Sequence, residues 1–329
     1  MPELRKDPIT ERWVIISPER AKRPEDFTVS KAERKEGVCP FCQGNESMTP
    51  EEVFAIREGT EANSQGWKTR VVPNKFAALA EGPLPELNSN GIYKNMAGHG
   101  THEVIVETPK HSVTLADLGV QEISDFLKTC TARFDHMKKL GSVKYAMLFR
   151  NNGQSAGASR EHPHSQIIGL PITPKALSEE ITPAKEFNRS TGGCIFCKML
   201  DDEIKQESRI VLLNEKFAAI CPFAPHYAFE TWILPRRHES SFENISDSEI
   251  TCLAEILKSV LTKMKQTLKD PPYNMMLHTS PFGENLEGIY HWHIEIAPSL
   301  NIIAGFERGT DFYINPTPPE TAAEYLRKA

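Results

Sequence analysis

The sequence predicts an α+β protein made of two repeated halves, each with a mostly antiparallel sheet and one long helix. Two observations lead to this prediction. The same four motifs occur twice in the same order, and each copy contains several short strand-like runs but a single long amphipathic run. Strands that flank one helix, without regular strand–helix alternation, favour α+β over a parallel sheet. We place the N-terminal domain at residues 1–185 and the C-terminal domain at 186–329, with the seam in the polar stretch 179–193.

The repeat consists of a Cys-x-x-Cys pair, a Lys-Phe-Ala-Ala run, a segment that contains a histidine near its end, and a His-x-His segment. In the first half these read CPFC, RVVPNKFAAL, HEVIVETPKHS and HPHSQI; in the second they read CIFC, VLLNEKFAAI, FETWILPRRHES and HWHIEI. The main difference is an insertion at 81–101 of the first half. Because it is rich in Gly, Asn and Pro, we expect it to be a loop.

Long helices are expected at 113–141 and 244–270, where apolar residues recur at helical spacing. The first run ends in lysines and a glycine, and Ser246 or Asp247 is the candidate N-cap of the second. Short runs rich in β-branched or aromatic residues predict strands at 103–108, 145–151, 230–235 and 273–278.

The stretch HPHSQII at 162–168 is also expected to be a strand. Because side chains alternate along a strand, His162, His164 and Gln166 then point to the same face. Three polar groups in one row indicate a functional site.

Composition limits the classes of function. The net charge of −6 gives no reason to expect nucleic-acid binding, and no apolar run approaches the roughly 20 residues of a membrane span. The N-terminus lacks an apolar secretory core, so we expect a cytoplasmic protein. Seven cysteines in such a chain favour metal ligands or free thiols over disulfides.

Each cysteine pair, with two histidines that follow it, has the composition of a tetrahedral zinc site without an open position, which predicts two structural zinc ions. The alternative for each pair is a metal-free knuckle or a redox pair. The remaining histidines His99, His102, His136 and His226 show no such pattern and are interpreted as surface or structural residues. The expected ligands are Cys39, Cys42, His111 and His162 in the first half, and Cys194, Cys197, His238 and His291 in the second.

The motifs resemble the galactose-1-phosphate uridylyltransferase family, in the histidine-triad superfamily of nucleotide-binding proteins. The resemblance rests on DPITERWVIISPERAKRP at 7–24, on CPFC, VVPNKFAAL and ETPKHS, on NNGQSAGASREHPHSQ at 151–166, and on the C-terminal HWHIEIAP and AGFERGTDFYINP. It implies a histidine-triad-like fold in both halves, with the catalytic site in the N-terminal half, and a homodimer.

The resemblance also implies a reaction and its residues. His164 corresponds to the family's nucleophile, which takes a nucleoside monophosphate from a nucleotide sugar and passes it to a sugar 1-phosphate. Gln166 corresponds to a catalytic residue that binds a phosphoryl oxygen. UDP-glucose and galactose 1-phosphate are the first expected substrates. The further substrate-binding positions implied are Arg20, Arg23, Asn74, Asn151, Gly153, Ser159 and Glu307.

The residue types themselves are consistent with this chemistry. A neutral imidazole whose far nitrogen is held by an acceptor is a nucleophile near neutral pH. A glutamine cannot supply a proton to a leaving group, whereas a phosphate leaving group needs none. Gln166 therefore favours phosphate leaving groups and transfer over hydrolysis.

Three alternatives stay open. The lysine and glutamine that contact the hexose in the family are not evident, because Asn301 and Tyr313 stand at those places. The residues of the motifs also resemble the ADP-glucose phosphorylase branch of the family. That branch transfers AMP, with inorganic phosphate as acceptor. The second metal could use Glu180, His278, His291 and His293 in place of the cysteines. A zinc-stabilised nucleotide-binding module without turnover is the alternative of another class.

Overall fold

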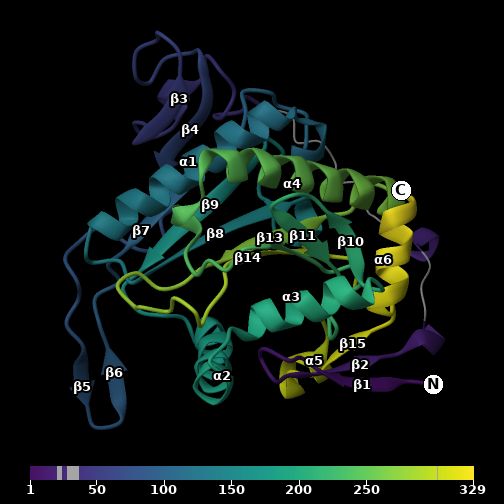
Figure 1. The fold of residues 1–329 in the computed structure, drawn as a ribbon. Helices are drawn as coiled ribbons and strands as arrows, with labels where there is room; N and C mark the ends of the chain where they lie inside the picture. The colour runs from purple at the N-terminus through teal and green to yellow at the C-terminus, as the bar shows by residue number, and fades with distance from the viewer. Residues whose placement is uncertain (21–23, 28–36, 302) are drawn as a thin grey trace.

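The structure is a computed structural model that describes residues 1–20, 24–27, 37–301 and 303–329. Its centre is a sheet of ten strands in which every neighbouring pair is antiparallel (Figure 1). In order across the sheet, the strands are β10 (Ile210–Leu213), β11 (Phe217–Ile220), β12 (Thr231–Pro235), β14 (His293–Pro298), β13 (Tyr273–His278), β8 (Tyr145–Asn152), β9 (His164–Leu170), β7 (Thr101–Val106), β4 (Trp67–Pro73) and β3 (Phe54–Arg57).

Each half of the sequence supplies five neighbouring strands of this sheet. The two sets join where β8 pairs with β13, with Asn151 opposite Asn274. The α+β prediction is confirmed, but the halves share one continuous sheet instead of having a sheet each. Each set of five strands would by itself leave an open edge at β8 or β13. The pairing of β8 with β13 satisfies the backbone groups of both edges.

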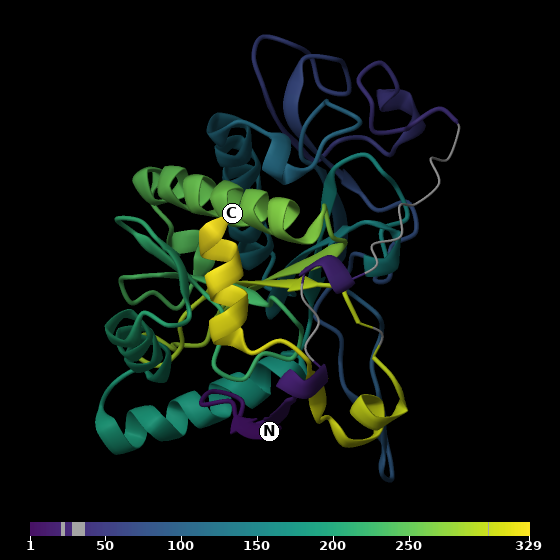
Figure 2. The ribbon, with the colours of Figure 1, turned by 90° about the vertical axis from the view of Figure 1, so that its right-hand side faces the viewer.

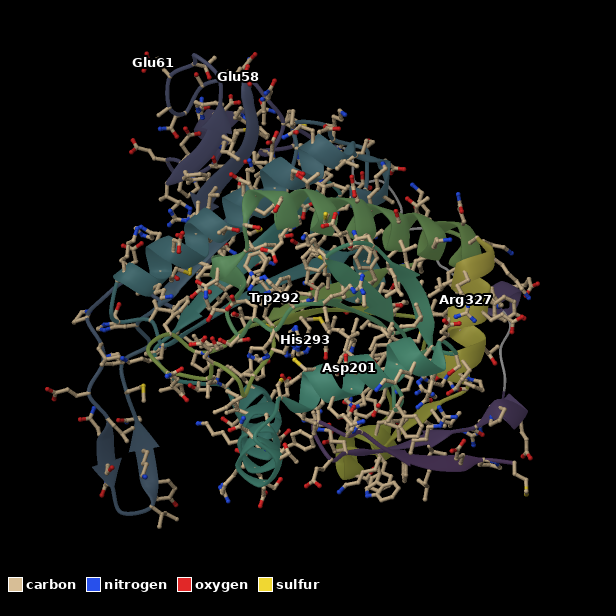
Figure 3. All side chains as sticks on the ribbon, in the orientation of Figure 1. Glu58, Glu61, Asp201, Trp292, His293 and Arg327 are labelled. Atoms are coloured by element: carbon tan, nitrogen blue, oxygen red, sulfur yellow. The ribbon has the colours of Figure 1, made fainter. Side chains whose placement is uncertain are left out.

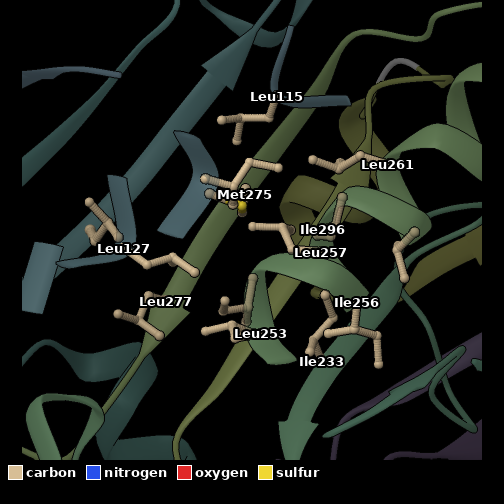
Figure 4. Packing of buried hydrophobic residues seen from close by; sticks show 14 of the residues in the cluster. Leu115, Leu127, Ile233, Leu253, Ile256, Leu257, Leu261, Met275, Leu277 and Ile296 are labelled. Atoms are coloured by element: carbon tan, nitrogen blue, oxygen red, sulfur yellow. The ribbon is translucent and has the colours of Figure 1, made fainter. Parts of the chain in front are cut away.

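Helices cover both faces of the sheet. On one face lie α1 (Val120–Lys139) and α4 (Asp247–Leu268), and on the other α2 (Lys175–Thr191) and α3 (Ile195–Gln206) (Figures 1 and 2). The side chains of β11 alternate between the two faces of the sheet. Phe217 and Ala219 belong to the core under α4, whereas Ala218 and Ile220 belong to the core under α3. Figure 4 shows Leu253 and Leu257 of α4 packed against side chains of the sheet.

The two predicted long helices are confirmed with shorter bounds. Ser246 is the N-cap of α4, since its side chain accepts a hydrogen bond from the backbone N–H of Glu249. The segment before α1 forms a short 3-10 turn. The 3-10 turns in the described part of the chain are η1 (Pro18–Arg20), η2 (Pro24–Asp26), η3 (Glu46–Met48), η4 (Leu115–Asp117), η5 (Gln154–Ala156) and η6 (Phe242–Asn244).

The two ends of the chain meet in a small second sheet. Strand β2 (Trp13–Ile16) lies between β1 (Glu3–Lys6) and β15 (Tyr313–Asn315), and it runs parallel to β15. The short α5 (Gly305–Thr310) leads into β15, and α6 (Pro319–Lys328) then packs against α4. No helix in the described residues combines the length and the apolar character that crossing a bilayer requires.

Two expectations about local structure are corrected, for the insertion and for the start of β9, and the structure also shows the conformation of the expected seam. The insertion at 81–101 is not only a loop, because it carries the hairpin β5 (Asn88–Asn90) and β6 (Tyr93–Asn95), which stands away from the body in Figure 1. The polar stretch 179–193 at the expected seam is mostly helical and belongs to α2. The strand expected over 162–168 begins at His164, so that His162 lies just before it.

Candidate active site and metal-binding groups

The first expected metal group is assembled. The ligand atoms of Cys39, Cys42, His111 and His162 all lie within 4.8 Å of one another. Cys42 Sγ is 3.2 Å from His111 Nδ1 and 3.6 Å from His162 Nδ1. Ligands on a tetrahedral zinc with bonds of about 2.0–2.3 Å would lie about 3.3–3.8 Å apart, so that this donor set fits such an ion.

His162 has the protonation state that a ligand requires. Burial lowers its pKa to about 4, so the ring is neutral at physiological pH. Its Nε2–H donates to the carbonyl oxygen of Thr108 at 2.8 Å, which leaves the lone pair of Nδ1 facing Cys42. A backbone acceptor on the far nitrogen is the usual way in which proteins orient a histidine ligand.

The second metal group repeats this geometry. Cys194, Cys197, His238 and His291 also bring their ligand atoms within 4.8 Å of one another. His291 Nε2–H donates to the Pro235 carbonyl at 2.9 Å and turns Nδ1 toward Cys197 Sγ, 3.5 Å away. Hydrogen bonding from Cys197, together with His238 and His291, lowers the pKa of the Cys194 thiol to about 3, although burial opposes this. The pKa of the other thiol, Cys197, is raised by the same hydrogen bond, so that Cys194 is the member of the pair that favours the thiolate form.

His164 is the first residue of β9 and is held in one orientation. Its Nδ1–H donates to the carbonyl oxygen of His162 at 2.8 Å, and the ring of Phe41, between the two cysteines of CPFC, packs 5.5 Å from it. The side chain is largely buried, and burial, with the charges of Arg150 and Arg160, lowers its pKa. The Nε2 atom of this neutral ring has no hydrogen-bond partner within the described chain and is free to act as a nucleophile.

A cavity of about 460 Å³ opens beside His164. Its lining includes three of the expected substrate positions, Asn151, Gly153 and Ser159. It also includes Arg150 and Arg160, which the sequence analysis had not singled out. Gly153 has φ +85°, and a Cβ there would lie 2.8 Å from Pro272 Cβ, so that only glycine fits this turn of the wall.

Gln166 forms a polar cluster with Asn74 and His102. The Oε1 atom of Gln166 lies 2.8 Å from His102 Nε2 and 3.3 Å from Asn74 Nδ2. Asn74 and Gln166 were both expected in the site, whereas His102 was interpreted as surface or structural; its hydrogen bonds are compatible with that interpretation and place it beside Gln166. The pairing of β7 with β9 brings His102 to Gln166, and the pairing of β4 with β7 brings Asn74, which follows β4, to His102; local spacing gave no signal of either.

Comparisons with known proteins identify the family of this chain. The sequence profile described as "Galactose-1-phosphate uridyl transferase, N-terminal domain" matches residues 1–174, and the profile of its C-terminal domain matches 180–302. The chain belongs to this family. ADP-glucose phosphorylase of Arabidopsis thaliana is 38% identical over 99% of this chain and 93% of its own length. Galactose-1-phosphate uridylyltransferase of Thermotoga maritima is 31% identical over 100% and 98%.

Solved structures of the uridylyltransferase family share the fold. The Arabidopsis ADP-glucose phosphorylase with bound ADP-glucose superposes with a TM-score of 0.84 at 36% identity, covering 100% of this chain and 99% of that one. A structure described as uridylyltransferase gives a TM-score of 0.78 at 31% identity, covering 100% of this chain and 98% of that one. The family's N-terminal profile ends at residue 174 and its C-terminal profile begins at residue 180, while the domain boundary at 185/186 stays a prediction.

Four described positions that the uridylyltransferase resemblance implied are not among the residues that line this cavity: Arg20, Glu307, and Asn74 and Gln166 of the polar cluster. Arg23 lies outside the described residues. Arg20 ends the exposed turn η1, and Glu307 lies in α5, where its carboxylate accepts a hydrogen bond from the backbone N–H of Ala304 at 3.1 Å. Their substrate roles stay predictions.

The structure separates the two sets of ligands that competed for His291 in the uridylyltransferase comparison. His291 lies with the cysteines, and Glu180, His278 and His293 form a neighbouring group of their own. His278 Nδ1 lies 2.8 Å from Glu180 Oε1, and the Tyr290 hydroxyl donates to Glu180 Oε2 at 2.6 Å. In Figure 3, His293 lies in the interior of the molecule. The cysteine set is therefore complete without these three residues.

Proposed function

We propose that this chain transfers a nucleoside monophosphate from a nucleotide sugar to a phosphate-bearing acceptor through a covalent intermediate on His164. The observation that carries the proposal is the fixed Nδ1–H bond from His164 to His162, which leaves the lone pair of Nε2 at a cavity lined by polar and cationic groups. In the first step, Nε2 attacks the α-phosphorus, an N–P bond forms, and the P–O bond to the sugar 1-phosphate breaks. In the second step, a phosphate oxygen of the acceptor attacks the same phosphorus and breaks the N–P bond.

The charge that develops on the phosphoryl oxygens requires fixed donors. The Ser159 hydroxyl and the Arg150 guanidinium line the cavity. Gln166 follows His164 by two residues on β9, so that both side chains lie on the same face of the strand. None of these groups needs to donate a proton to the leaving group, because a sugar 1-phosphate departs as an anion. The same reasoning favours a phosphate over water as acceptor.

Zinc in both Cys₂His₂ groups is part of this proposal. With four protein ligands each, the ions would hold structure and leave no open position for a substrate. In the first half, Cys39, Cys42, His111 and His162 would fix the start of β9, and thereby the ring of His164, without contact to the nucleotide.

Two pairs of substrates fit this chemistry. UDP-glucose with a hexose 1-phosphate, the galactose-metabolism reaction, is supported by the similarity over the whole chain to the Thermotoga uridylyltransferase. ADP-glucose with inorganic phosphate is supported by the higher identity to the Arabidopsis phosphorylase and by Asn301 and Tyr313 at the hexose positions. The mechanism at His164 is the same for both.

The test is to incubate the purified protein separately with UDP-glucose and ADP-glucose, without acceptor, and to measure its intact mass at mild pH. A UMP adduct that His164→Ala lacks and His136→Ala, an exposed control on α1, retains supports uridylyl transfer. An AMP adduct with the same dependence supports the phosphorylase reaction. Failure of both donors to modify a folded, metal-loaded protein contradicts the proposal and favours the binding module.

A further inference from the structure

His102 makes two hydrogen bonds that fix both nitrogens of its ring. Its Nδ1 accepts from the backbone N–H of Ala78 at 3.1 Å, so that Nδ1 carries no proton. Its Nε2 lies 2.8 Å from Gln166 Oε1, an atom that can only accept. The ring is thus the neutral Nε2–H tautomer, and it donates to Gln166.

Asn74 strengthens the same arrangement. Its Oδ1 accepts from the backbone N–H of Phe76 at 2.9 Å. Its Nδ2 lies 3.0 Å from His102 Nε2 and 3.3 Å from Gln166 Oε1. Because Nδ2 and Nε2 both carry protons, Gln166 Oε1 is the atom of this pair that accepts from the Asn74 NH₂ group. Two donors therefore converge on the carbonyl oxygen of Gln166. The Gln166 NH₂ group has no protein partner in the described part of the chain, and it remains available to a ligand.

The second half of the molecule lacks this device. Val104 pairs with Gln166 across β7 and β9, and Trp232 pairs with Glu295 across β12 and β14. Two residues before each partner stand His102 and Glu230, so that a pair of carboxylates occupies the place of the histidine and the amide. The oxygens of Glu230 accept hydrogen bonds from Trp232 Nε1 and the backbone of His226 and Tyr227. At this place in the two sets of described strands, a histidine and an amide stand in the first half and two carboxylates in the second.

We propose that His102 is a positioning residue for nucleotidyl transfer, because its Nε2–H fixes the Gln166 amide with the NH₂ group toward the phosphoryl oxygens. This inference rests on the proposed function of the site. Without the donor at position 102, the amide can turn over and present its carbonyl oxygen to the phosphate, where two acceptors repel each other. His102 thereby affects the rate of transfer and not the binding of the nucleotide.

Paired variants separate the two nitrogens of His102. His102→Gln keeps an N–H donor near the place of Nε2, whereas His102→Asn keeps a group only near Nδ1. We expect His102→Asn to slow formation of the His164 adduct by about 10- to 100-fold, less than the loss of a donor that touches the phosphoryl group because Gln166 itself remains, and His102→Gln to stay within about threefold of the natural rate. The Kd of the nucleotide sugar, measured in the His164→Ala background, should change by less than about threefold in both His102 variants.

A double-variant cycle tests whether His102 acts through Gln166. In the Gln166→Ala background, His102→Asn should slow adduct formation by less than about twofold further, because the group that it orients is gone. His136→Asn is the matched control and should leave the rate unchanged. His102→Ser replaces His102→Asn if the latter lowers the melting temperature.

The outcomes distinguish this inference from the proposed function. Adduct formation by the natural protein, with a rate that His102→Asn and His102→Ser leave unchanged, overturns the role of His102 and keeps His164. Multiplicative effects of the His102 and Gln166 changes also overturn it, since independent residues behave that way. The absence of any adduct in the natural protein overturns the proposed function itself, and the inference with it.

Discussion

The carbonyl oxygen of His162 accepts the hydrogen bond from His164 Nδ1–H at 2.8 Å. His162 turns its own Nδ1 toward Cys42, so that one short segment faces the metal group with one histidine and the cavity with the next. The second half repeats the contact, with His293 Nδ1 3.1 Å from the His291 carbonyl. The metal group and the candidate nucleophile are therefore coupled through a single backbone carbonyl.

Loss of the first metal should impair the chemistry. We expect Cys42→Ser to release one metal equivalent and to slow adduct formation on His164 by about 10- to 100-fold, because the segment that orients the ring loses its anchor. Metal content by elemental analysis and the adduct rate by intact mass measure both effects. Cys252→Ser on α4 is the control and should alter neither. A Cys42→Ser protein that lacks the metal and reacts at the natural rate would disprove the coupling.

The second half should contribute to nucleotide binding through Asn274. Its Nδ2 donates to Asn151 Oδ1 and to the Ala156 carbonyl, both at 2.8 Å, and thereby holds the wall of the cavity. We expect Asn274→Ala to weaken binding of the nucleotide sugar by up to about tenfold, the value of one net hydrogen bond, with little change in the rate at saturation. Calorimetry in the His164→Ala background measures the affinity, with Asn90→Ala on the hairpin as control. An unchanged affinity would mean that Asn151 needs no such support.

Glu307 should act on the cavity of a second copy. It lies in α5 and does not line the cavity of its own chain, while the family resemblance implies a homodimer and a substrate role for this residue. We expect the mass in solution to be that of a dimer by light scattering. Mixed dimers of His164→Ala and Glu307→Ala chains should then regain about a quarter to a half of the activity, because one of the two sites combines natural residues. Mixing that restores no activity, although the chains exchange, would contradict a shared site.

The ion pair at the start of α4 should make the stability of the protein depend on pH. The Arg237 hydrogen bond, with the cap at Ser246, lowers the pKa of Glu249 to about 2, although burial opposes this. A carboxyl whose pKa falls on folding stabilises the protein fully above its unfolded pKa of about 4.3, and this contribution is lost as the pH falls toward 2. We expect the difference in unfolding free energy between the natural protein and Glu249→Gln to be largest at pH 6–7 and to shrink below about pH 4.3.

Denaturant unfolding at several pH values measures this difference. Because the partner Arg237 is 43% exposed, the effect should be small and should weaken with salt. Glu255→Gln, a neighbouring charge change on α4, should show no such dependence. A difference that grows as the pH falls would contradict the assignment.

The sequence by itself determined the duplication, both Cys₂His₂ groups and the two long helices, because each depends on residues that recur at a fixed spacing. It also placed His164 on a strand beside a metal ligand, since the alternation of a strand is a local property. The repeated order of the Cys-x-x-Cys pair and the histidine segments was enough to group Cys39 and Cys42 with His111 and His162. These features could be predicted because they depend on the order of residues along the chain and not on contacts between distant strands.

Only the tertiary structure decided how the two halves meet. The pairing of β8 with β13 joins two sheets into one and brings Asn274 to Asn151, 123 residues apart in the chain. The register of β7 against β9 likewise sets His102 beside Gln166, and no spacing in the sequence predicts a register between strands. His291 could belong to two ligand sets by sequence, and the positions of the side chains assign it to the cysteines. Contacts between distant strands are fixed by the packing of helices on both faces of the sheet. The order of residues along one strand gives no information about this packing.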